Sequence, residues 1–133
     1  GYGAGQFCLG TMYEDGHGVD QDYEKALEWF LKAAEQDVDA SFNQIAWVYH
    51  LMGKYDEALP WAEKAVETAP DDPDYIDTLA TVYEGLGRYK EALEQFEECL
   101  RLYKENDDEE GAEETKQKID ALKKKMQRTG NKR

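Results

Sequence analysis

Hydrophobic and polar residues follow the same pattern three times between residues 4 and 106. The pairs Leu9-Gly10, Ile45-Ala46 and Leu79-Ala80 recur 36 and then 34 residues apart, and each pair is followed by a tyrosine at the same offset. A second set of positions, which opens with a tyrosine and contains two small residues at helical spacing, recurs 32 and then 34 residues apart. A period of this length marks a solenoid in which each repeat is one helical hairpin.

The alternation of small and bulky residues within each copy is explained by packing. Small residues allow two helix backbones to approach closely, and large apolar residues fill the remaining space between helices. The small positions are Gly10, Ala26, Ala46, Ala58, Ala80 and Ala92. We expect the core to consist of Leu9, Tyr13, Leu27 and Phe30 in the first copy, Ile45, Tyr49, Leu59 and Trp61 in the second, and Leu79, Tyr83, Leu93 and Phe96 in the third.

The same pattern predicts an all-α fold of three antiparallel helix hairpins and one further helix, which makes seven helices. The further helix has a narrow apolar stripe on an otherwise charged surface, which suits a helix that covers the end of a repeat array. The expected units are a first hairpin over 1–38, a second over 39–72, a third over 73–106, a capping helix over 107–128 and a basic disordered tail over 129–133.

The net charge of the chain limits the classes of molecule that we expect it to bind. The chain carries a formal net charge of −14, and residues 1–122 hold 10 basic against 30 acidic side chains. An acidic body repels phosphate backbones, so nucleic acid is not the expected partner. No apolar run approaches the roughly 20 residues that cross a bilayer, so we also expect no membrane span.

The positions of the cysteines and histidines predict neither a disulfide nor a metal site. Cys8 and Cys99 lie in the first and sixth expected helices, too far apart for a disulfide. Because free thiols fit a reducing compartment, we expect a cytoplasmic protein. The chain enters helix-forming sequence almost at once after Gly1, which suggests a piece of a longer protein whose signal sequence would be missing here. His17 and His50 have no Cys or His at ligand spacing, so we expect no metal and no cofactor.

Two related repeat families resemble this chain. Residues 9–35 closely resemble the Sel1-like repeat, whose connection between helices is four residues longer than in the other two copies and carries Gly16-x-Gly18-Val19. Residues 39–72 and 73–106 resemble tetratricopeptide repeats instead. The matching residues are Phe42, Ile45, Ala46, Tyr49, Gly53, Tyr55, Ala58, Ala62, Ala65 and Pro70 in the second unit, and Ile76, Leu79, Ala80, Tyr83, Gly87, Tyr89, Ala92 and Phe96 in the third.

This resemblance implies a right-handed superhelix in which the first helix of each hairpin lines a concave groove. One end of the groove is then aromatic and polar and the other is acidic, which suits a peptide with a hydrophobic residue and Lys or Arg. Tetratricopeptide repeats can bind the C-terminal carboxylate of a peptide through Lys, Arg and Asn side chains in the groove. At the matching positions of this chain only Asn43 is present, so we reject this mode of peptide binding. The expected groove residues are Phe7, Thr11, Glu14, Asn43, Trp47, His50, Asp77, Thr81 and Glu84, with Asp74 at the rim.

Three functions compete. The leading hypothesis is a non-catalytic protein interaction scaffold or adaptor, because no nucleophile, base and orienting group occur together. An enzyme would need two carboxylates with pKa values separated by burial, and most of the 30 acids fall on exposed helix faces, so we expect no enzyme. The alternative is the end of a longer repeat array that has no groove ligand and self-associates through its uncapped first hairpin, where Phe7 and Met12 lack a preceding repeat.

Overall fold

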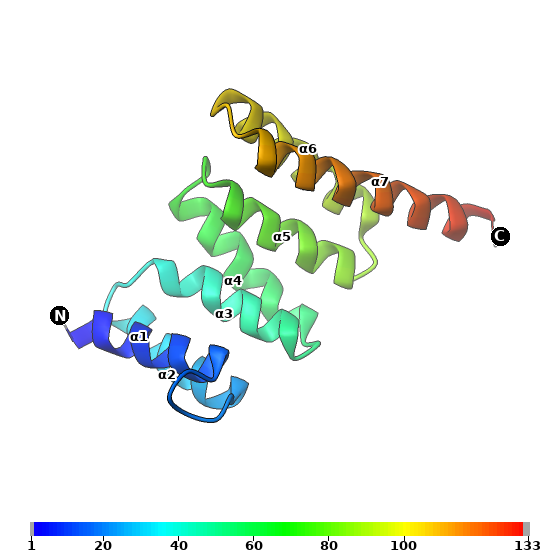
Figure 1. Ribbon diagram of the computed structural model, residues 1–133. Helices are drawn as coiled ribbons and strands as arrows, with labels where there is room; N and C mark the ends of the chain where they lie inside the picture. The colour runs from blue at the N-terminus through cyan, green and yellow to red at the C-terminus, as the bar shows by residue number, and fades with distance from the viewer. Residues whose placement is uncertain (1, 132–133) are drawn as a thin grey trace.

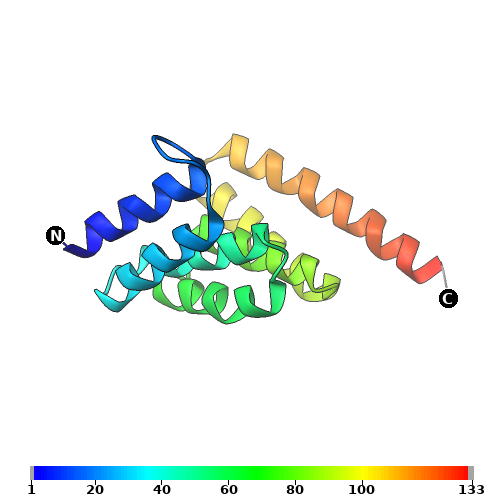
Figure 2. The same cartoon turned by 90° about the horizontal axis from the view of Figure 1, so that it is seen from below.

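The computed structural model describes residues 2–131, and within them it contains seven α-helices and no strand. Successive helices form antiparallel hairpins that stack in chain order, with α1 and α2 at one end and α6 and α7 at the other (Figures 1 and 2). The all-α array of three hairpins and a last helix is therefore confirmed. The helices are α1 (Tyr2–Asp15), α2 (Tyr23–Glu35), α3 (Ala40–Leu51), α4 (Tyr55–Thr68), α5 (Pro73–Gly85), α6 (Tyr89–Glu105) and α7 (Glu109–Asn131).

The helix ends follow from local chemistry. Asp22 caps α2 by accepting a hydrogen bond from the Lys25 amide at 3.1 Å, and Asp72 caps α5 by accepting one from the Asp74 amide at 3.0 Å. Gly53 and Gly87 follow α3 and α5 with φ angles of 78° and 76°, which is the backbone conformation that ends a helix tightly. These short connections fold each hairpin back on itself.

The longer connection in the first hairpin is closed by hydrogen bonds to the end of α1. The Asp22 amide donates to the Tyr13 carbonyl oxygen at 2.8 Å, and the Gln21 side-chain amide donates to the Glu14 carbonyl oxygen at 2.9 Å. Gly16 and Gly18 adopt φ angles of 76° and 77° within it, as the sequence predicts. The loop therefore holds the backbone at the last turn of α1, where Glu14 lies.

Small residues sit where helices meet, and the core follows the sequence prediction with one exception. Ala26, Ala58 and Ala92 are fully buried, and Phe30 packs directly over Gly10, where an added Cβ would lie 2.6 Å from the ring. The prediction for Leu9 was wrong, because this side chain is 36% exposed. Its helix, α1, makes its main helix contacts with α2, so the flank that carries Leu9 stays open.

Helix α7 covers the last hairpin through buried apolar side chains, Ala112, Ile119 and Leu122. It continues to Asn131, whereas the sequence predicts a disordered tail over 129–133; residues 132–133 lie outside the described part. The good helix formers Lys, Met, Gln and Arg fill the preceding turns, and the Thr129 hydroxyl donates to the Lys125 carbonyl oxygen one turn earlier at 2.9 Å.

Both cysteine thiols are free. Cys8 is exposed, and Cys99 is buried with its thiol donating to the Pro73 carbonyl oxygen at 3.4 Å. Burial, the main cause, raises the pKa of the Cys99 thiol to about 12, which makes it unreactive.

No helix over residues 2–131 combines the length and apolarity that crossing a membrane requires.

We predict that Gly10→Ala destabilises the protein although alanine is the better helix former. The new methyl group collides with the fully buried Phe30 ring, and such overpacking costs about 1–3 kcal/mol. Gly5→Ala is the matched control on the same helix, since nothing lies within 4 Å of its Cβ position. It should stabilise by roughly 0.5–1 kcal/mol. Urea denaturation of both variants measures the difference, and equal shifts would contradict the packing argument.

Candidate peptide-binding groove

The first helices of the three hairpins share one surface hollow of about 300 Å³. Half of the ten residues expected in the groove line it. Two further residues, Gln44 and Thr78, line it as well; neither holds one of the groove positions implied by the family resemblance, so the resemblance does not predict them. We call this site the groove hollow; it is lined by Glu14 from α1, Asn43, Gln44 and Trp47 from α3, and Asp74, Asp77 and Thr78 from α5.

The other five expected residues lie outside the groove hollow. Phe7 packs on Phe30 with ring centroids 5.4 Å apart, so it belongs to the core of the first hairpin. The hydroxyls of Thr11 and Thr81 donate to carbonyl oxygens in their own helices, at 3.2 and 2.8 Å. The last two, His50 and Glu84, are held by an aromatic stack and an ion pair described below.

Two buried acceptor atoms lack a hydrogen-bond partner at the groove hollow. They are Oε1 of Glu14 and Oδ1 of Asn43, which come from different helices. Burial, with a smaller contribution from Asp15, raises the pKa of Glu14 to about 7. A buried acceptor without a donor is costly, so these two atoms call for a hydrogen-bond donor.

The pKa of Asp74 is also raised. Burial raises its pKa, and the neighbouring charges of Asp72 and Asp77 raise it further. A hydrogen bond with Tyr103 and the charge of Lys118 oppose this rise without cancelling it. The groove therefore holds a second carboxylate with a raised pKa, although this one is exposed to solvent.

The remaining two groove carboxylates are paired with lysines from α7. Lys118 Nζ lies 3.0 and 3.1 Å from the two carboxylate oxygens of Asp77, and Lys125 Nζ forms an ion pair with Glu84. The sequence predicts an acidic end of the groove that is open to a partner's cations. The structure corrects this, because α7 packs alongside and supplies two cations of its own.

An aromatic stack backs the groove hollow. Trp47 and His50 have ring centroids 5.0 Å apart, and His50 and Tyr55 follow at 5.5 Å. Burial, opposed by the charge of Glu84, lowers the pKa of His50, which favours the neutral imidazole. The stack holds the Trp47 indole as a fixed aromatic wall beside the unpaired acceptors.

The family comparison agrees with this architecture. The tetratricopeptide repeat model matches residues 37–105, more than half of the chain, and the Sel1 repeat model matches residues 3–38. This chain belongs to the tetratricopeptide repeat family. Its first hairpin is a Sel1 repeat, which confirms the order of units that the sequence indicates. No curated protein matches the sequence.

Solved tetratricopeptide structures share the fold at low identity. The type III secretion translocator chaperone SycD of Yersinia enterocolitica is 19% identical with a TM-score of 0.79, over 93% of this chain and 85% of SycD. The first such domain of human RPAP3 is 16% identical with a TM-score of 0.82, over 97% and 95% of the two chains. PcrH, solved in complex with the chaperone binding region of PopD, is 16% identical with a TM-score of 0.78, over 92% of each chain.

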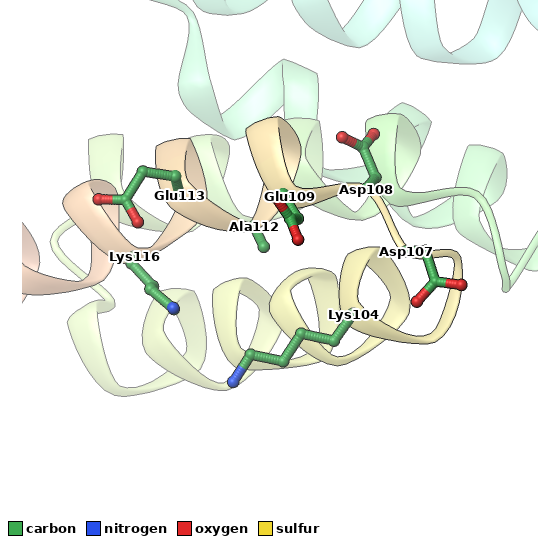
Figure 3. A pocket seen from close by; sticks show the side chains of 7 residues that line it. All are labelled: Lys104, Asp107, Asp108, Glu109, Ala112, Glu113 and Lys116. Carbon is green, nitrogen blue, oxygen red and sulfur yellow. The ribbon is translucent and has the colours of Figure 1, made fainter.

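A larger hollow of about 440 Å³ lies where α6 turns into α7 of this tetratricopeptide domain. Figure 3 shows that the carboxylates of Asp107, Asp108 and Glu113 point in different directions rather than toward one point. Asp108 is also occupied as a cap, since it accepts a hydrogen bond from the Gly111 amide at 2.9 Å. Among residues 2–131 no group of three or more His, Cys, Asp or Glu side chains could hold a metal ion.

We predict that Glu14→Gln stabilises the protein at pH 8 and not at pH 4. Because the folded-state pKa of about 7 lies above the unfolded value, the folded state loses stability as pH rises from roughly 4.3 through 7. Glutamine keeps the size and removes the charge. Solvent screening at this half-buried site limits the gain to about 1 kcal/mol.

Urea denaturation at the two pH values measures this effect. Glu67→Gln, an exposed acid on α4, is the matched control, and its effect should stay within about 0.5 kcal/mol at both pH values. A Glu14→Gln variant that is less stable at pH 8 would contradict the electrostatic picture.

Proposed function

We propose that the groove of this chain binds an extended segment of a partner protein that carries a hydrophobic and a basic side chain. The observation that carries this proposal is the groove hollow, to which three successive hairpins each contribute a first helix. A surface built by successive repeats suits a ligand that runs across them. The domain then acts as a non-catalytic scaffold or adaptor.

Geometry and charge both support this choice of ligand. Trp47 offers an aromatic wall of the kind that dominates binding energy at protein interfaces. Glu14 and Asp74 have no lysine comparable to those that pair with Asp77 and Glu84, so the free negative charge of the groove lies beside Trp47. A basic residue next to a hydrophobic one complements this arrangement.

The fold comparison supports a role in binding proteins. PcrH, which shares this fold, was solved with the chaperone binding region of PopD, a segment of a partner protein. Tetratricopeptide and Sel1 domains are typically binding modules without catalysis. The buried Cys99 thiol, with a pKa of about 12, offers no nucleophile at the groove.

The open flank of α1 supports a second candidate, self-association. Tyr2 is 76% exposed, and Leu9 and Met12 are 36% and 37% exposed on the same helix. Exposed apolar side chains in one region favour contact with another protein surface. Sedimentation velocity tests this candidate directly, because a strict monomer at high concentration contradicts it.

We predict that Trp47→Ala weakens groove binding strongly. A displayed library of random peptides is selected on the wild-type protein, and the enriched peptides are measured by fluorescence anisotropy. Truncation of a central tryptophan costs about 2 kcal/mol or more, which lowers affinity roughly 30-fold. Basic and hydrophobic residues should be enriched together.

Trp29→Ala is the matched control for this experiment. Trp29 lies on α2 outside the groove hollow, with Lys32 Nζ 4.5 Å from its ring centroid. We expect the selected peptides to bind this variant with unchanged affinity. Peptides whose affinity survives Trp47→Ala would place binding elsewhere and overturn the proposed function.

We predict that Lys118→Met strengthens binding of basic peptides. The substitution removes the intramolecular cation from Asp77, which lies on the wall of the groove hollow. Release of one partly exposed carboxylate should raise affinity about threefold. Lys123→Met makes the same charge change on the side of α7 that faces α6 and should have a smaller effect. Equal effects of the two variants would show that only net charge matters.

A further inference from the structure

The four carboxylates of the groove fall into two electrostatic classes. Asp77 and Glu84 each have a lysine of α7 as partner. Glu14 has no lysine partner and is half buried, whereas Asp74 is exposed, with Tyr103 and Lys118 near its carboxylate but no ion pair to a lysine. The groove hollow therefore contains two carboxylates without a lysine partner, Glu14 and Asp74, beside Asp77, which has one.

The groove hollow is a shallow recess, open to solvent and large enough for one side chain. Glu14, Asn43 and Asp74 reach it from three different helices, and Trp47 forms its aromatic wall. The unpartnered buried atoms, Glu14 Oε1 and Asn43 Oδ1, are both acceptors. The Thr78 hydroxyl cannot serve them while it donates to the Asp74 carbonyl oxygen at 3.1 Å. A volume of about 300 Å³ is at the small end of ligand sites.

We propose that this recess is a subsite for a single arginine side chain of the partner segment, with Glu14, Asn43 and Asp74 as acceptors and Trp47 as the stacking surface. The inference rests on the proposed function and adds to it the identity and the position of the basic residue.

Arginine fits these observations better than lysine does. A guanidinium group has five donors in a rigid plane, so it can reach acceptors on separate helices and stack on an indole at the same time. An ammonium group is a compact point charge that keeps its water more strongly. The acceptors here are dispersed over three helices beside a flat ring, which matches the planar group.

Glu14 shows the signature of a residue kept for binding rather than for stability. Its buried oxygen has no partner within the chain, and its carboxylate is half buried. Neutralising it should favour the free protein and disfavour the complex. A purely structural residue would change both in the same direction.

The test uses peptides selected on the wild-type protein whose affinity depends on Trp47. The basic position of each is made as arginine, lysine or citrulline, which keeps the shape of arginine without its charge. We expect arginine to bind tightest, lysine about threefold weaker and citrulline about tenfold weaker or more. In Glu14→Gln the gap between arginine and citrulline should shrink to about threefold, while Glu67→Gln should keep it.

The outcomes separate this inference from the proposed function. If Trp47-dependent peptides bind equally with arginine, lysine and citrulline, the arginine subsite is overturned and the groove still stands. An unchanged arginine-to-citrulline gap in Glu14→Gln also overturns the subsite. If no selected peptide depends on Trp47, the proposed function fails and the subsite fails with it. Thermal unfolding of Glu14→Gln at pH 8 shows that any loss of binding is not a loss of fold.

Discussion

Close contact between a glycine and an aromatic ring is the constraint on which this array depends. An added Cβ at Gly10, Gly85 or Gly111 would lie 2.6 Å from the ring of Phe30, Tyr55 or Tyr103. The first of these contacts joins the two helices of one hairpin, the second joins α5 to α4 of the preceding hairpin, and the third joins α7 to α6. Because each ring fits only where the backbone is bare, the contacts limit how the helices can slide along one another.

Through α7, this register also determines which side chains face the groove. Gly111 lies in the first turn of α7 against Tyr103 of α6, and apolar contacts continue along the helix to Leu122. With α7 in that register, Lys118 and Lys125 each face a carboxylate of α5 that precedes them by 41 residues. The helix that closes the core thus also removes two negative charges from the binding surface.

The fold could be predicted from the sequence because its determinants are local. Helical periodicity, glycine breaks and small residues at fixed spacing all recur within one repeat of 32 to 36 residues. The pairing of Lys118 with Asp77 could not be predicted, because it depends on the register of two helices that are not adjacent in the chain. The pairing of Lys125 with Glu84 could not be predicted for the same reason. Leu9 fits the core pattern, but the pattern cannot tell which helix flank has a neighbour.

One equivalent position shows how a repeated scaffold acquires a specific surface. Glu14, His50 and Glu84 each follow the recurring tyrosine of their unit. Glu84 is neutralised by Lys125, and His50 is stacked between Trp47 and Tyr55. Glu14 is left with an unpartnered buried carboxylate oxygen, as His50 is with its Nδ1, and the longer Sel1 loop fixes the Glu14 backbone through Gln21. The distinguishing chemistry of the groove therefore arises at the junction of the two repeat types, where the loop specific to one family orients a side chain into a surface shared with the other.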